Sequence, residues 1–168
     1  KNGVFSGLIG QSYKFKNPDS FEKGSGLEEK LSDFIVDFLF KPNKEITLSY
    51  RGRLDDHDIN LRRSEFDMLV TYPKWGIRAG HVLLNNVEIL NFKEQREARF
   101  ATFFNLTDNW LIQAALRYDV VSKNSLNNRI SAVYIDDCMS FEIGFRRKFS
   151  EYRDLKPSNS FMIKFNVF

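Results

Sequence analysis

Apolar and polar residues alternate along this chain almost from end to end, and this alternation limits the fold more than any other feature. A period of two sends successive side chains to opposite faces of a β-strand, whereas a helix needs a period of 3.6. Helical periodicity is nearly absent. The pattern predicts an all-β fold of ten antiparallel, up-and-down strands, at residues 4–15, 31–40, 45–55, 58–72, 75–84, 96–106, 109–121, 127–136, 138–149 and 158–168.

Most predicted strands separate into one apolar face and one polar face. In the strand at 158–168 the apolar set is Phe161, Ile163, Phe165 and Val167. Charged residues of both signs gather on the opposite faces of the predicted strands. The main members of this polar set are Asp33, Asp37, Arg51, Arg53, Arg99, Arg117, Glu142 and Arg146. Because the carboxylates and bases are mixed, we interpret this set mainly as an ion-pair network lining a polar interior.

Two architectures produce such faces. A soluble sandwich or barrel turns its apolar face toward a core, whereas a transmembrane barrel turns it toward lipid and keeps a polar lumen. Most of the predicted strands reach the 9 to 11 residues or so that a tilted strand needs to cross a bilayer. No continuous apolar stretch is long enough for a transmembrane helix. Strand length therefore favours the transmembrane barrel without excluding a soluble lipid-binding β-barrel.

The connections between the predicted strands favour the same reading. The second, fourth, sixth and eighth connections are tight, at 41–43, 73–74, 107–109 and 136–137, while those at 16–30, 85–95 and 150–157 are long. Outer-membrane barrels show this parity, with short periplasmic turns and longer outer loops. On this interpretation the tight turns are periplasmic, and so is the rim that carries Cys138, the single cysteine of the chain.

Composition narrows the function classes. The net charge is +3, with both signs scattered rather than gathered into a basic patch, so nucleic acid is not an expected partner. We see no signal peptide at Lys1 and Asn2, and we expect a mature or excised piece. The stretch "DDHD" (residues 55–58) lacks the spacing of a calcium loop, and we predict a solvated loop tip there rather than a metal site. We expect no cofactor and no enzymatic activity.

Several stretches carry a family resemblance, in matching order and spacing over nearly the whole chain. They are "IGQSYKF" (9–15), "GSGLEEKLSDF" (24–34), "LSYRGRLDDHDINLRRSEF" (48–66), "LTDNWLIQAALRYD" (106–119) and "YIDDCMSFEIGFRRKFSEYRDLKPSNSFMIKF" (134–165). These stretches resemble the C-terminal half of the barrel of the LptD family, which assembles lipopolysaccharide in the outer membrane of Gram-negative bacteria. The stretch at 82–95 shows no such likeness.

The resemblance implies that residues 1–168 are one domain, the C-terminal portion of a very large outer-membrane barrel whose N-terminal periplasmic domain is absent here. It implies lipopolysaccharide as cargo, an LptE-like lipoprotein plug, outer-membrane lipid around the barrel, and a periplasmic transport bridge reached through the absent domain. It also implies a lateral gate formed by the last strand, with Phe161, Ile163, Phe165 and Val167 on its apolar face, and a disulfide from Cys138 to the absent domain. Arg51, Arg53 and Arg117 are candidates for contact with lipopolysaccharide phosphates.

The residues alone leave other functions open. One alternative is a complete small outer-membrane barrel acting as a pore or a protease. A protease needs acidic and histidine residues that converge at the outer rim, and "DDHD" is the single hint of such a site. The other alternative is a soluble β-barrel that binds a lipid inside.

Overall fold

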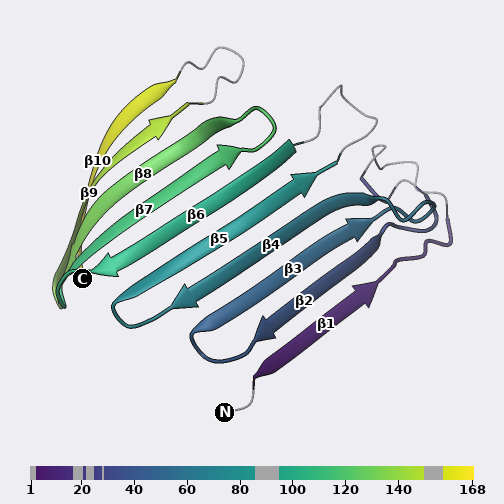
Figure 1. The fold of residues 1–168 in the computed structure, drawn as a ribbon, viewed down its shortest axis with the longest axis horizontal. Helices are drawn as coiled ribbons and strands as arrows, with labels where there is room; N and C mark the ends of the chain where they lie inside the picture. The colour runs from purple at the N-terminus through teal and green to yellow at the C-terminus, as the bar shows by residue number, and fades with distance from the viewer. Residues whose placement is uncertain (1–2, 17–20, 22–24, 28, 86–94, 150–156) are drawn as a thin grey trace. The chain divides into compact units, whose positions relative to one another are not determined.

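A computed structural model describes residues 3–16, 21, 25–27, 29–85, 95–149 and 157–168. The described residues contain ten strands. Figure 1 labels them in chain order. They are β1 (Val4–Gly10), β2 (Phe34–Lys41), β3 (Ile46–Leu54), β4 (Leu61–Thr71), β5 (Trp75–Leu84), β6 (Gln95–Asn105), β7 (Trp110–Asp119), β8 (Asn124–Ile135), β9 (Met139–Lys148) and β10 (Ser158–Val167). The described residues contain no helix long and apolar enough to cross a lipid bilayer.

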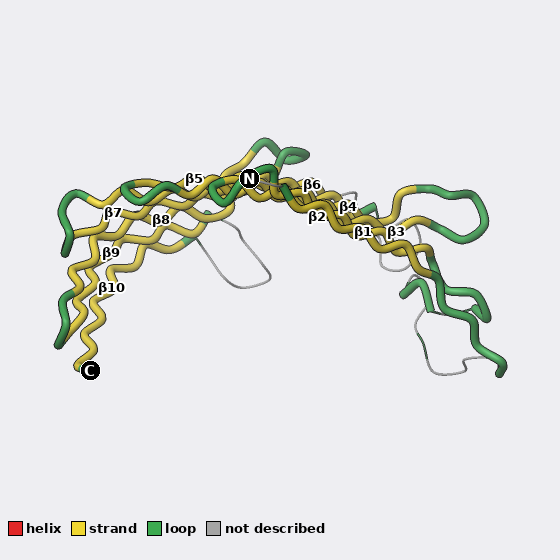
Figure 2. Tube along the Cα trace, turned by 90° about the horizontal axis from the view of Figure 1, so that it is seen from below, coloured by secondary structure: helices red, strands yellow, loops and turns green. Residues whose placement is uncertain are grey.

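The strands form one antiparallel sheet whose order follows the sequence, from β1 to β10. In the described residues β1 pairs only with β2, and β10 pairs only with β9, so the sheet is not closed. Strands and loops account for every described segment in Figure 2. The predicted all-β class, the antiparallel up-and-down order and the number of strands are confirmed.

The largest difference from the predicted strands lies at the end of β1. The strand stops at Gly10 rather than at residue 15. Beyond this point the backbone pairs with the end of its own connection: Ser12 N donates to Ser32 Oγ (2.8 Å), and Tyr13 forms an isolated bridge with Leu31. A local hairpin therefore replaces the predicted extension of the strand.

The strands β4 and β8 also begin at residues other than those predicted. The start of β4 moves from residue 58 to Leu61, because the turn before it contains Ile59 at a φ of 56°. The strand β8 begins at Asn124 rather than at residue 127, after a tight turn that ends with Lys123 at the same positive φ. The predicted connection at 122–127 is therefore shorter than expected. The predicted long connections at 85–95 and 150–157 lie mostly outside the described residues.

Three of the four tight turns on the predicted periplasmic side, those before β3, β7 and β9, share one chemical device. A side-chain oxygen two or three residues before the next strand accepts backbone N–H groups that would otherwise be unpaired. Asn43 Oδ1 accepts from Glu45 and Ile46, and Asp136 Oδ1 accepts from Cys138 and Met139. Thr107 Oγ1 does the same for the two residues that lead into β7.

Contacts divide the chain into two units, which are described separately. The first comprises residues 1–68 and 80–96, and the second comprises residues 69–79 and 97–168. In the first unit, β1, β2 and β3 pair so that Phe5 lies opposite Phe40, and Asp37 lies opposite Arg51. In the second, the ladder from β6 to β10 places apolar residues opposite apolar ones, as with Ile163 and Ile143. Each unit therefore has one mainly apolar face and one mainly polar face.

The described residues of neither unit form a conventional hydrophobic core. Val82, at 8% exposure, is the single buried apolar side chain recorded for the described residues, and none of their large side chains is fully buried. Large apolar residues lie exposed along the sheet, from Phe5 (69%) in β1 to Phe161 (82%) in β10. The apolar face thus lacks the second layer that a soluble sheet packs against.

A close approach at Gly76 offers a test of the packing in the second unit. A Cβ at this position would overlap the ring of Phe103. We expect Gly76→Val to lower the free energy of unfolding by about 1–3 kcal/mol, because the ring must leave its position. Urea unfolding in detergent or nanodiscs measures the effect. The matched control is Gly10→Val, where the nearest atom beyond the chain neighbours is 3.8 Å away; an equal loss in both variants contradicts the prediction.

Candidate functional site

The polar face of the first unit carries the predicted ion pairs between β2 and β3. Arg51 Nε donates to Asp37 Oδ2 at 3.0 Å, between residues that lie directly opposite each other in the ladder. Arg53 Nε lies 3.2 Å from Asp33 Oδ2. The Arg51–Asp37 pair is exposed, and such pairs contribute about 0–1 kcal/mol, so its main effect is to neutralise charge on the face.

Arg53 and Asp33 also hold the connection between β1 and β2. Asp33 is only 4% exposed, and its backbone N–H donates to Gly26 O (3.0 Å). Arg53 Nη1 donates to Ser25 O at 2.8 Å. Gly26 has a φ of +73°, and a Cβ there would overlap the Asp33 carboxylate. A glycine is therefore required at this position by both backbone conformation and space.

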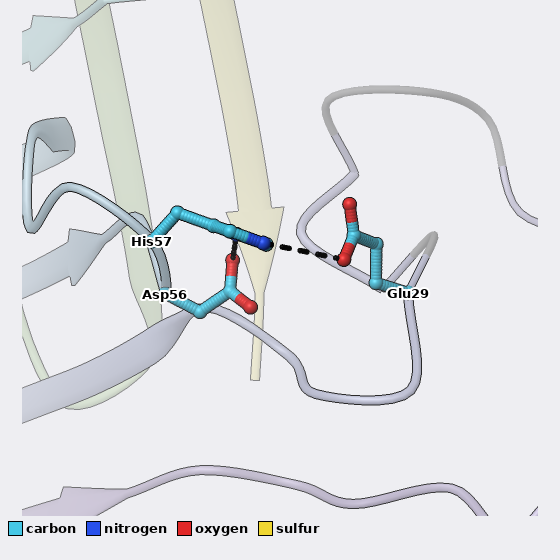
Figure 3. Close-up of side chains that lie close together, drawn as sticks. All are labelled: Glu29, Asp56 and His57. Atoms are coloured by element: carbon cyan, nitrogen blue, oxygen red, sulfur yellow. Dashed lines mark hydrogen bonds and ion pairs between the residues drawn. The ribbon is translucent and has the colours of Figure 1, made fainter.

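The turn between β3 and β4 lies against the same connection. His57 Nδ1 is 2.8 Å from Asp56 Oδ1, and His57 Nε2 is 3.7 Å from Glu29 Oε2 (Figure 3). The hydrogen bond to Asp56, with the charges of Asp56 and Glu29, raises the pKa of His57. The contact therefore joins two connections that lie far apart in sequence and strengthens when the imidazole is protonated.

Asp55 differs from the solvated loop tip predicted for residues 55–58. Its side chain is buried, and Arg62 donates to Asp55 Oδ2 through Nε (2.6 Å) and Nη2. The backbone N–H of His57 donates to Asp55 Oδ1 at 2.9 Å. His57 and Asp58 remain exposed, so the prediction holds for them and fails for Asp55.

Carboxylate and imidazole atoms near this turn lie close enough to one another to be candidate metal ligands. Two groups have candidate ligand atoms within 4.8 Å of one another, Glu29–Asp56–His57 and Asp33–Asp55–Asp56. In the second group, Arg53 and Arg62 already form ion pairs with Asp33 and Asp55. We therefore interpret the cluster as a network of ion pairs that links the connection between β1 and β2 to the turn between β3 and β4.

The second unit repeats the ion-pair pattern on its polar face. Arg117 donates to Glu97 through both Nε (2.8 Å) and Nη2 (2.6 Å), and Arg99 Nε donates to the same carboxylate at 2.6 Å. On β9, Glu142 binds Arg129 of β8 and lies 3.4 Å from Lys164 Nζ of β10. The predicted residues Arg99, Arg117 and Glu142 thus belong to cross-strand clusters. The same ladder places Arg146 opposite Arg129 and Ser160, still on this face.

A hollow of about 220 Å³ interrupts the polar face of the second unit. Small residues form much of its lining: Ala101 faces Ala115 in the ladder, and Gly76 and Ser131 also line the hollow. Arg78 and Arg129 also reach it. The alternation of apolar and polar residues does not predict this hollow, because small residues such as alanine contribute little to that pattern.

The residues predicted for the gate strand share one face of β10. Phe161, Ile163, Phe165 and Val167 are all strongly exposed, and three of them lie opposite Phe145, Ile143 and Phe141 of β9. The other long side of β10 has no strand partner in the described chain. This strand therefore combines an apolar face with an unpaired backbone edge.

Cys138 lies at the end of the turn between β8 and β9, where its thiol is free and exposed. Its backbone carbonyl accepts a hydrogen bond from Phe168 N (2.9 Å), so the cysteine lies beside the end of β10. The turn carboxylate Asp136, which accepts from the backbone of Cys138 and Met139, has a lowered pKa for that reason.

Comparison with known families decides the family of the chain. The family model for LptD, described as LPS transport system D, matches residues 1–110. The chain belongs to the LptD family. The match covers β1 to β6 and reaches the first residue of β7. Membership in LptD places the chain in the transport of lipopolysaccharide. No curated protein matches the chain.

The buried carboxylate of Asp55 gives a prediction about pH. Its pKa is lowered from 3.8 to about 2, first by the backbone N–H of His57 and then by Arg62. The stabilisation from this carboxylate is therefore present above pH 4 or so and is lost as the pH falls toward 2. We expect the side-chain carboxyl carbon of Asp55 to titrate near pH 2 by NMR in nanodiscs.

In Arg62→Gln the titration midpoint of Asp55 should rise toward 3.8 without reaching it, because the backbone donor remains. Arg51→Gln is the matched control, since Arg51 binds Asp37 rather than Asp55. A midpoint near 4 in the unaltered protein contradicts the hydrogen bonds that His57 and Arg62 donate to this carboxylate.

Proposed function

We propose that this chain is the C-terminal portion of an outer-membrane β-barrel that transfers lipopolysaccharide to the outer leaflet. The observation that carries the proposal is a single sheet with an exposed apolar face and an ion-paired polar face, in a chain of the LptD family. On this proposal the apolar face contacts lipid and the polar face lines the lumen.

The energetics of the apolar face support a lipid environment. Removing a large aliphatic or aromatic side chain from water contributes roughly 1.5–3 kcal/mol. Exposed large apolar side chains occur from β1 to β10. The favourable free energy of removing them from water is therefore lost if this face stays in water. The polar sugars and phosphates of lipopolysaccharide suit a charged lumen better than an apolar one. In a bilayer, the two unpaired edges of the sheet also require further strands to complete the barrel.

The proposal assigns the two ends of the sheet. The tight turns that precede β3, β5, β7 and β9 are placed in the periplasm, and the connections before β2 and β4 at the outer surface. An LptE-like lipoprotein in the lumen and a periplasmic transport bridge are proposed partners, in line with the family resemblance. The strand β10 is proposed as one lip of a lateral gate, supported by its unpaired edge and its exposed apolar face.

A photo-reactive residue at Met162 tests this function. Met162 is opposite Gly144 in the ladder, on the face of β10 that also carries Lys164. We expect ultraviolet irradiation of growing cells to cross-link lipopolysaccharide to position 162. The control is the same photo-reactive residue at Phe141, which lies on the apolar face near the turn at Cys138. The proposal assigns Phe141 to the depth of the inner leaflet. Cross-links to phospholipid alone at both positions would contradict the proposal.

Cys138 is proposed to form a disulfide with a cysteine of the family's periplasmic domain. Support comes from its exposure, from its place on the tight-turn side of the sheet, and from the oxidising character of the periplasm. Its position beside the end of β10 means that such a bond would anchor the proposed gate strand at its periplasmic end.

The disulfide is measured by alkylation of cell extracts. We expect Cys138 to resist a maleimide reagent until a reductant is added, because an oxidised sulfur is not a nucleophile. In Cys138→Ser the shift on a non-reducing gel should disappear, whereas Ser140→Ala should leave it unchanged. Full alkylation of Cys138 without a reductant would show that no disulfide forms in cells.

A further inference from the structure

We propose that Arg146 and Lys148, on the polar face of β9, bind a phosphate group of a lipid headgroup beside the last strand. This inference rests on the proposed function and deepens it, because it names the residues that hold the cargo next to β10. The ligand class is a phosphorylated glycolipid, recognised through its phosphate.

The ladder places four polar side chains around the two cations. Arg146 lies opposite Ser160 of β10 on one side and Arg129 of β8 on the other. Lys148 lies opposite Ser158 of β10, with Asn127 of β8 on its other side. Because residues two apart in a strand point to the same face, about 7 Å apart, both cations can reach one phosphate group. Lys148, Ser158 and Ser160 are exposed, so the site is open to a ligand.

The charge balance distinguishes this pair from the other cations of the polar face. Arg51, Arg53 and Arg117, which the sequence suggested for phosphate contact, each form an ion pair with a carboxylate. In the described part of the chain, neither Arg146 nor Lys148 forms an ion pair with a carboxylate.

Neighbouring charges add to this difference. The residue across the ladder from Arg146 is Arg129, a like charge, and Arg129 already binds Glu142. Like charges directly opposite each other in a ladder are destabilising. An anion between the strands relieves this repulsion. A phosphate suits the position because arginine donates to it through two parallel N–H groups, lysine adds a point charge and serine hydroxyls add donors.

The same stretch contains its own control. Arg147 lies between the two cations in sequence but points to the opposite, apolar face, where its guanidinium lies 4.7 Å from the centroid of the Phe149 ring. Arg147→Gln therefore removes one charge from the same strand at the same height without touching the proposed site. A long-range electrostatic effect would respond to both substitutions, whereas a binding site responds only to those on the polar face.

The experiment places a photo-reactive residue at Met162, on the polar face of β10 next to Ser160, in the intact protein in growing cells. We expect the double variant Arg146→Gln/Lys148→Gln to reduce cross-linking to lipopolysaccharide by about tenfold or more, as expected for loss of two charged hydrogen-bond donors. Arg147→Gln should change it by less than about twofold. Arg146→Lys, with Lys148 kept, should retain most of the signal.

A second arm identifies the source of the phosphate. The purified intact protein in nanodiscs is irradiated with lipopolysaccharide, with lipopolysaccharide stripped of its phosphates, or with lipopolysaccharide and excess inorganic phosphate. The phosphorylated lipid should cross-link in an Arg146- and Lys148-dependent manner, and the stripped lipid should cross-link no better than it does in the double variant. Equal cross-linking of the two lipids, or complete displacement by inorganic phosphate at millimolar concentration, overturns the lipid site.

The outcomes separate this site from the function on which it rests. If position 162 cross-links lipopolysaccharide in the unaltered protein and the double variant leaves that signal unchanged, the site is wrong and the function stands. If position 162 does not cross-link lipopolysaccharide in the unaltered protein, both proposals fail. Heat-modifiable migration on gels verifies that each variant is folded before it is compared.

Discussion

The apolar face of the sheet is the constraint on which the other features depend. An antiparallel sheet normally hides such a face against a second layer, and the described residues supply none. The opposite face carries carboxylates and guanidinium groups that need water or each other. The sheet therefore needs two different environments at once, which a membrane boundary provides and a uniform solvent does not. Membership in the LptD family is in keeping with this requirement.

The charges on the polar face fall into two classes. Most cations are already bound, as Arg117 is to Glu97 and Arg129 is to Glu142, so they neutralise the face and leave little free charge for a ligand. At the end of β9 next to β10 the balance changes, because Arg146 and Lys148 form no ion pair with a carboxylate of the described chain. The uneven distribution of ion-paired and unpaired cations, rather than the net charge of +3, leaves unpaired positive charge on the polar face beside β10.

Predictions from the sequence were correct for features that depend on residues close to one another in the chain. The faces of β9 and β10 were predicted correctly, because alternation is a property of each strand alone, and the ladder confirms them through pairs such as Ile143 and Ile163. They failed where distant segments meet. The burial of Asp55 and the early end of β1 at Gly10 both follow from a connection that folds onto other elements, and no local pattern reports such contacts.

By itself, then, the sequence determined the all-β class, the order of ten strands and the tight turns on one side of the sheet. These properties follow from the period of the backbone and from turn side chains such as Asn43 and Asp136, which act within a few residues. Only the tertiary structure decided which charges meet, because pairing depends on the register between strands. Register placed Arg51 against Asp37 and left Arg146 against Arg129. A shift of one residue would have exchanged the faces of a strand and changed every such pair.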